Sequence, residues 1–208
     1  HSSSNQTPSH TAPPPPPFRP LPARRCLQQS AQKRKAALYK SLGRHSDAIA
    51  ALNSYLSTFQ NDGDAWHELA EMYIAQQQHS SALFCYEELI LTNPHNFHYH
   101  LKYAELLYTV GVGKPVGSSR ADDFETARKY FVQAVELNPD GVYNCRALYG
   151  VLMASTALRR LNPKRQSESD VAVFDWASKK LASMNQAGVQ DGEMKKVLAN
   201  TLEALQTQ

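Results

Sequence analysis

Residues 63–96, GDAWHELAEMYIAQQQHSSALFCYEELILTNPHN, carry the pattern that decides the fold. Apolar and small residues recur three or four positions apart in two stretches, and a short polar segment separates the stretches. This spacing predicts two amphipathic α-helices joined by a turn. Pro94 lacks a backbone donor, so we expect it to end the second helix and direct the chain onward. The segment is therefore predicted to form one helical hairpin.

The same pattern repeats on both sides of this hairpin. Shifts of 34 residues, and one shift of 45, align small and aromatic positions: Ala36 with Ala70 and Ala104, Tyr39 with Tyr73, Ala48 with Ala82 and Ala127, and Tyr86 with Phe131. The longer shift indicates an insertion at 110–121, which is rich in Gly, Ser and Pro. A period near 34 with two helices per unit is typical of tetratricopeptide repeats (TPR). We predict an all-α, TPR-type α-solenoid of antiparallel helical hairpins with C-terminal capping helices.

Ten residues are predicted to define the repeats. Small residues let two helices approach closely, large ones fill the space between hairpins, and prolines end the units. They are Trp66, Leu69, Ala70, Tyr73, Ala82, Tyr86, Pro94, Ala127, Phe131 and Pro139. The indole of Trp66 could instead serve as a ligand platform, but its position in the repeat favours a core role.

Three segments are expected along the chain. Residues 1–30 hold eight of the twelve prolines and are predicted to be a disordered tail with polyproline II character; an SH3-type ligand is the less favoured reading. Residues 31–141 are predicted to form about three repeats, with helices at 32–42, 46–59, 63–76, 80–92, 97–109 and 122–137. Residues 142–208 are expected to cap the solenoid with helices at Val142–Arg160, Glu168–Gln186 and Glu193–Leu205.

Charge and cysteine content exclude several classes of protein. Residues 1–40 contain seven of the 22 basic residues and no acidic one, so the rest holds 15 basic and 19 acidic groups. A mildly acidic folded part argues against nucleic acid as a partner. No apolar run reaches the roughly 18–20 residues that span a bilayer, and no signal peptide is evident. Cys26, Cys85 and Cys145 lie too far apart in the sequence for a local zinc site or redox dithiol. Cys85 and Cys145 sit among apolar residues and are predicted to be buried thiols, which suggests a reducing compartment.

No segment carries a pattern typical of catalysis or cofactor binding. The run from Gly111 to Lys114 resembles a phosphate loop but lacks its spacing, and Pro115 follows the lysine. His95, His98 and His100 cluster without a nearby carboxylate or thiol, so we interpret them as surface and inter-repeat histidines. We therefore expect no catalytic residue, no cofactor and no metal site.

The concave face of a solenoid, lined by the first helix of each hairpin, is the expected partner-binding surface. Its predicted residues are Asp64, His67, Glu71, Ala75, His98, Lys102 and Leu106. TPR co-chaperones grip acidic C-terminal tails with a clamp of basic and amide side chains. The matching positions here are Lys33, Ala37, Glu68, His98 and Lys102. The clamp asparagines are missing and Glu68 would repel a carboxylate, which weakens that interpretation.

Several short sequence segments are more specific to one family than the repeat pattern is. Residues 64–71 (DAWHELAE), 82–89 (ALFCYEEL) and 92–96 (TNPHN) resemble the family of subunit 2 of the endoplasmic reticulum (ER) membrane protein complex. Residues 103–105 (YAE), 127–131 (ARKYF) and 202–207 (LEALQT) continue the resemblance. That family carries additional N-terminal repeats where this chain has its proline-rich stretch. We therefore expect an N-terminally divergent or incomplete member.

The resemblance implies a non-catalytic, cytosolic scaffold subunit, held peripherally on the cytoplasmic side of the ER membrane. Its implied partners are cytosolic segments of membrane-spanning subunits and a cytosolic partner subunit. The implied role is support for the insertion of transmembrane proteins, including tail-anchored ones. A free cytosolic TPR adaptor or co-chaperone that binds protein tails stays open as the alternative. An enzyme with an embedded repeat is disfavoured because helical hairpins account for the chain after residue 31.

Overall fold

The computed structural model describes residues 23–115, 119–139, 144–161 and 167–188. These residues form eight α-helices and no strand. The helices are α1 (Ala23–Ser41), α2 (His45–Leu56), α3 (Gly63–Ala75), α4 (His79–Thr92), α5 (Phe97–Gly113), α6 (Arg120–Leu137), α7 (Asn144–Leu161) and α8 (Glu168–Gly188).

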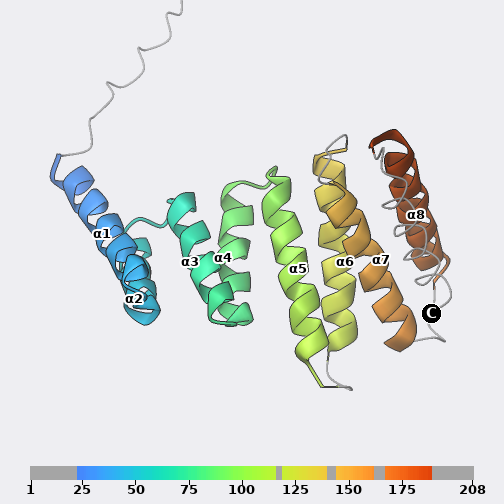
Figure 1. The fold of residues 1–208 in the computed structure, drawn as a ribbon, viewed down its shortest axis with the longest axis horizontal. Coiled ribbons are helices and arrows are strands. Elements are labelled where there is room, and N and C mark those ends of the chain that lie inside the picture. Colours follow the sequence, from blue (N-terminus) through green and yellow to red (C-terminus); the bar gives the residue numbers. More distant parts are fainter. Residues whose placement is uncertain (1–22, 116–118, 140–143, 162–166, 189–208) are drawn as a thin grey trace, which may run out of the picture.

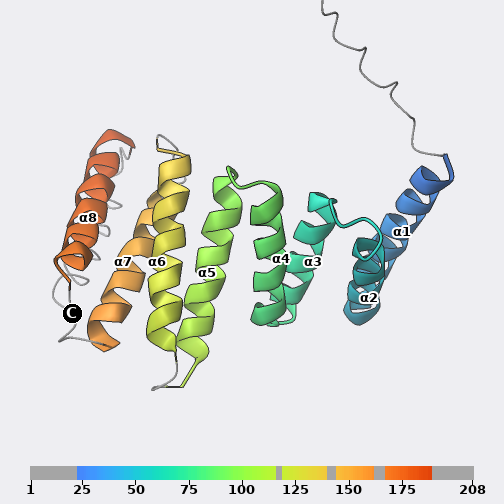
Figure 2. The ribbon, with the colours of Figure 1, turned by 180° about the vertical axis from the view of Figure 1, so that it is seen from behind.

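The helices pair into four hairpins that stand side by side in one row (Figure 1). Within each hairpin the two helices pack closely, and the second helix of each hairpin also packs on the first helix of the next. The two layers are clear at the last hairpins, where α7 crosses in front of α6 in Figure 1 and lies behind it in Figure 2. The predicted helical solenoid is confirmed.

The first two hairpins turn in the same way although their turn residues differ. Gly43 has a φ of 72° and Gln77, exactly one 34-residue period later in the sequence, has a φ of 60°. In both turns the next amide donates at 2.9 Å to a main-chain carbonyl five residues earlier. This is the hydrogen-bonded helix ending that favours glycine in the left-handed region. The backbone repeat therefore holds at Gln77 even where the sequence repeat does not.

Buried alanines mark the places where helices approach most closely. Ala36, Ala70 and Ala104 are equivalent under the 34-residue shift, and all three are buried. A second set of positions that the repeat aligns holds larger side chains, which are also buried: Leu52, Tyr86 and Phe131. A small residue on one helix facing a large one on the next allows dense packing without voids. One continuous core runs from Ala36 in α1 to Leu181 in α8.

The predicted boundary at residue 31 is wrong, because α1 begins at Ala23. The last proline of the tail is Pro22, and residues 23–30 (ARRCLQQS) consist largely of good helix formers. Averaging composition over the whole proline-rich segment hid this change. The remaining part of the predicted tail, residues 1–22, lies outside the described residues.

The expected insertion is also partly helical. Helix α5 continues to Gly113 and α6 starts at Arg120, so only the middle of 110–121 separates the two helices. A Cβ placed on Gly111 would come within 2.8 Å of the Phe124 ring, so glycine here permits close packing of α5 on α6. The segment that resembles a phosphate loop is therefore the last turn of a helix rather than a strand-to-helix loop.

The C-terminal helices follow the predicted pattern in part. Phe174, Ala177 and Leu181 of α8 are buried against the core, whereas Val171, expected on the same face, is 44% exposed. The expected helix at 193–205 lies outside the described residues. Among the helices that the structure describes, none is both long and apolar enough to cross a membrane.

Candidate protein-binding surface

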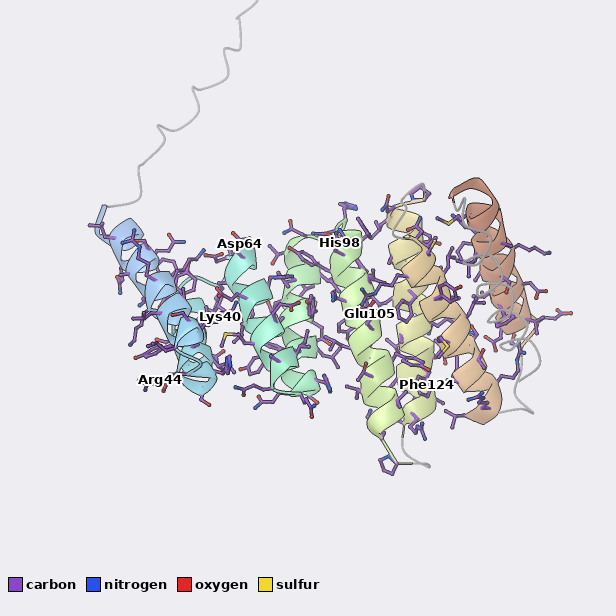
Figure 3. The ribbon with its side chains drawn as sticks, viewed as in Figure 1. Lys40, Arg44, Asp64, His98, Glu105 and Phe124 are labelled. Carbon is purple, nitrogen blue, oxygen red and sulfur yellow. The ribbon has the colours of Figure 1, made fainter. Side chains whose placement is uncertain are left out.

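The first helices of the hairpins present most of the predicted groove residues to solvent. Asp64, His67 and Glu71 on α3, and His98 on α5, are exposed, and Lys102 is half-buried. Figure 3 shows Asp64 and His98 at the starts of α3 and α5. We refer to the exposed face of α1, α3, α5 and α7 as the groove.

Leu106 was expected to line the groove, and that prediction is wrong. It is buried in the core, as are its neighbours Leu107 and Ala104 on α5. Helix α5 contacts α4, α6 and α7, so more of its surface is covered than in α3, which packs on α2 and α4. Ala75, the last residue of α3, is exposed as expected.

Ion pairs link neighbouring groove helices. Lys40 Nζ on α1 lies 3.1 Å from Glu68 Oε1 on α3. Arg146 on α7 makes two hydrogen bonds to the carboxylate of Glu105 on α5, one of them 2.9 Å between Nη2 and Oε2. Exposed pairs add little stability, but the two-pronged arginine geometry fixes the spacing of α5 and α7. The groove therefore carries matched charges at both ends of the array.

Sequence reasoning missed Lys40, Glu105 and Arg146 as groove residues. Glu105 could have been found, because the 34-residue shift aligns it with Glu71, which was predicted. Arg146 lies beyond the insertion and the end of the clear period, so no shift from the central hairpin reaches it. In Figure 3 Glu105 lies further along α5 than His98.

The middle of the groove contains aromatic and carboxylate contacts. The His67 ring lies 6.3 Å from the ring of Tyr86 and 6.5 Å from that of Tyr99, which joins α3 to α4 and α5. The Tyr86 hydroxyl donates to Glu71 Oε1 at 3.3 Å. Burial, reinforced by the Glu71 carboxylate, raises the pKa of Tyr86 far above its ordinary value. Tyr86 is therefore a neutral hydrogen-bond donor, and Glu71 is held at a fixed position.

A second polar network fixes α3 to the first hairpin. Asp62 caps the N-terminus of α3, accepting from the Ala65 amide at 3.3 Å. The same carboxylate accepts from the Tyr55 hydroxyl at 2.5 Å and pairs with Lys33 at 2.5 Å. Burial alone would raise the pKa of Asp62, but the bonds from Lys33, Tyr55 and Ala65 outweigh it and lower the pKa. Asp62 thus joins α1, α2 and α3 through one ionised group.

We expect Asp62→Asn to lower the free energy of unfolding by about 1–2 kcal/mol at pH 7. The folded pKa of Asp62 is depressed, so its contribution is present above the unfolded pKa and is lost as the pH falls through the folded value. The difference between wild type and Asp62→Asn should therefore shrink below about pH 4. Urea unfolding at pH 7 and at decreasing pH measures it. Asp47→Asn, which removes an exposed pair with Arg44, is the control and should cost under about 0.5 kcal/mol.

The clamp positions are occupied by internal contacts. Lys33 pairs with Asp62 at 2.5 Å and Lys102 lies 3.8 Å from Glu105, while Glu68 pairs with Lys40. Ala37 is exposed on α1 and offers no polar group. An acidic tail would have to compete with Asp62 and Glu105 for these lysines. This arrangement disfavours recognition of acidic C-terminal tails.

The three histidines of residues 95–100 lie in different surroundings. His100 is buried, with Nε2 2.7 Å from the Pro94 carbonyl oxygen, whereas His95 and His98 are exposed. Within the described ranges, no group of three or more His, Cys, Asp or Glu side chains is placed to hold a metal ion. The ring of His100 also stacks on Tyr130 at 5.8 Å, linking α5 to α6.

The residues predicted to define the repeats lie in the core, against it, or at the ends of helices. Trp66 is half-buried against the core, and its indole donates to the Gln60 carbonyl at 2.7 Å. Leu69, Ala70, Ala82, Ala127 and Phe131 are buried, Tyr73 is half-buried, and Pro94 and Pro139 follow the C-caps of α4 and α6. Burial raises the pKa of the Cys85 thiol to about 12, so that thiol is unreactive. Cys145 is partly buried rather than buried.

The row of antiparallel hairpins and the repeated buried alanine positions define a TPR-type helical repeat protein. A solved C-terminal part of a TPR repeat-containing protein from Cytophaga hutchinsonii has the same fold, with a TM-score of 0.57 at 13% identity over 82% of this chain and 60% of that chain. The family model described as the EMC2 TPR-like repeat domain matches residues 22–117.

Two curated relatives point to one family. "ER membrane protein complex subunit 2-A" of Xenopus laevis is 43% identical over 155 residues, which is 73% of this chain and 48% of the relative. "ER membrane protein complex subunit 2" of Dictyostelium discoideum is 31% identical over 160 residues, 73% of this chain and 47% of the relative. The chain belongs to the family of ER membrane protein complex subunit 2. It spans about half the length of the curated relatives that it matches.

Proposed function

We propose that the chain is a non-catalytic scaffold subunit of the ER membrane protein complex. It sits peripherally on the cytoplasmic side of the membrane, where it binds cytosolic segments of the membrane-spanning subunits and a cytosolic partner subunit. Through these contacts it supports the insertion of transmembrane proteins, including tail-anchored ones. The observation that carries this proposal is the 43% identity over 155 residues to a protein named as subunit 2 of that complex.

The groove has the properties of a surface that binds a protein segment. It is long, because four first helices contribute to it, and it presents carboxylates, lysines and histidines along that length. Pairs such as Glu105–Arg146 and Lys40–Glu68 keep the helices at fixed distances before a partner arrives. Such preorganisation lowers the cost of ordering the surface on binding.

A matched pair of charge reversals tests the role of the groove. Lys102→Glu places a negative charge in the middle of the groove, whereas Lys179→Glu makes the same change at an exposed position of α8. We expect Lys102→Glu to reduce photo-crosslinks from α3 and α5 to partner subunits several-fold, because it places a second negative charge beside Glu105 and alters the charge pattern of this face. Lys179→Glu should leave them unchanged. Equal crosslinking by the two variants would contradict binding through this face.

A further inference from the structure

An apolar pocket of about 380 Å³ lies in the groove between α5 and α7. Each of these helices supplies one face to it, with residues three and four positions apart. These residues are Tyr108 and Thr109 of α5, and Arg146, Tyr149, Gly150 and Met153 of α7. Met153 is 42% exposed and the Arg146 side chain is 64% exposed, so a side chain of a partner protein can reach the pocket. Its volume lies within the usual range for ligand pockets.

The missing side chain of Gly150 gives the pocket its depth. An added Cβ there would come within 2.4 Å of the Phe131 ring on α6, so glycine leaves that ring at the floor of the pocket. Tyr108 and Tyr149 line it from α5 and α7. Burial raises the pKa of Tyr108, so its phenol is neutral at physiological pH. Three aromatic rings from three helices therefore line one pocket.

The charges at the rim of the pocket are already matched. Glu105 of α5, labelled in Figure 3, accepts two hydrogen bonds from Arg146, and Lys102 Nζ lies 3.8 Å from the same carboxylate. A charged side chain that entered the pocket would lose its hydration, and the paired rim would offer it little in return. The pocket therefore favours an uncharged occupant.

Three features favour an aromatic ring over an aliphatic side chain. Rings that meet edge to face or offset gain more than the burial of their area alone. The thioether of Met153 is suited to contact with a ring edge, and the exposed guanidinium of Arg146 is suited to contact with a ring face. An aliphatic side chain would bury a similar area but would make none of these contacts.

We propose that this pocket binds one aromatic side chain of the protein segment that occupies the groove. The inference rests on the proposed role of the groove, and it adds the chemistry by which the partner is recognised. Tyr108 and Thr109 follow Lys102 by about two turns of α5, so the pocket lies beyond the polar middle of the groove. The partner segment therefore carries its aromatic residue where it passes between α5 and α7.

The pocket is tested by titrating the full chain with N-acetyl-phenylalanine amide, followed by NMR of the Met153 methyl group and the Thr109 amide. We expect saturable shifts at both residues with a dissociation constant of about 1–10 mM, and N-acetyl-leucine amide should bind at least about threefold more weakly. The methyl group of Met72, which is buried in α3, should not shift. The absence of a saturable shift, or leucine amide binding as tight as that of the phenylalanine amide, would overturn the proposal.

Variants at Met153 separate recognition from stability. Met153→Glu places a carboxylate in the apolar wall and should weaken binding of the phenylalanine amide at least about tenfold, as read from the Thr109 amide. Its melting temperature should stay within about 2 °C of wild type, because the position is partly exposed. Met153→Leu keeps an apolar wall and should bind within about threefold of wild type. Leu91→Glu, the same kind of change at an exposed position of α4, should leave binding unchanged. Unchanged binding by Met153→Glu, or an equal loss in Leu91→Glu, contradicts the proposal.

A crosslinking comparison connects the pocket to the partner. In the photo-crosslinking test of the groove, Met153→Glu should lower crosslinks from α5 to partner subunits several-fold, whereas Leu91→Glu should not. If Lys102→Glu lowers these crosslinks and Met153→Glu does not, the groove binds its partner without the pocket, and only the present proposal fails. The titration itself needs no partner subunit, so failure of the proposed function would leave its result in place.

Discussion

Replacing Gly150 with alanine should lower the free energy of unfolding by about 1–3 kcal/mol. In the middle of a helix the same change usually stabilises a protein by up to about 1 kcal/mol, because glycine is a poor helix former. Here a Cβ on α7 would come within 2.4 Å of the Phe131 ring on α6. Phe131 is buried, so its ring cannot swing into solvent to make room. Steric overlap therefore reverses the usual sign.

Gly113 provides the matched control. It lies in the last turn of α5, and an added Cβ would meet no atom of the described residues within 4 Å. Gly113→Ala should therefore be neutral or slightly stabilising in the same urea titration. Gly150→Ala combined with Phe131→Leu should cost less than the sum of the two single changes, because the smaller side chain relieves the overlap. A stabilising effect of Gly150→Ala would show that α6 and α7 are not as close as described.

Truncating Tyr86 to alanine should lower the free energy of unfolding by about 3–5 kcal/mol. The side chain is fully buried on α4, in the position that Leu52 and Phe131 occupy in the neighbouring hairpins. Removing it leaves a cavity where α3, α4 and α5 meet, and it also frees Glu71 from its hydrogen bond. Urea unfolding followed by circular dichroism measures the loss.

Two companion variants assign the cause. Tyr86→Phe keeps the ring and removes only the bond to Glu71, so it should cost about 0.5–1.5 kcal/mol. Phe84→Ala, on the same helix but 54% exposed, should cost under about 1 kcal/mol. If Phe84→Ala proves as costly as Tyr86→Ala, the orientation of α4 in the solenoid is wrong.

The sequence pattern predicted the fold where contacts recur at a fixed interval. The equivalent alanines at 36, 70 and 104, and the prolines at 94 and 139, follow from local rules about helix packing and helix ends, so the period alone was enough to predict the hairpins. The start of α1 was missed because the proline-rich tail dominated the composition of its neighbourhood. This error concerns the boundary of one helix and leaves the predicted architecture unchanged.

Features that depend on distant pairs of residues could not be read from the period. Gly111 was assigned to the insertion at 110–121, but it lies in α5, where it admits the Phe124 ring from α6. Leu106 was assigned to the groove because its burial arises only from packing among several helices. The ion pair between Arg128 on α6 and Asp170 on α8 joins residues that lie 42 positions apart in the sequence, and it forms only in the folded chain.

We propose that this chain works as a subunit of a membrane-protein complex, and purification of the tagged chain from cells in a gentle detergent tests this role. Mass spectrometry then identifies the proteins that accompany the chain. We expect integral membrane proteins, together with a cytosolic partner, to be recovered in fixed proportion to the chain. Recovery of the chain without any integral membrane protein would contradict it.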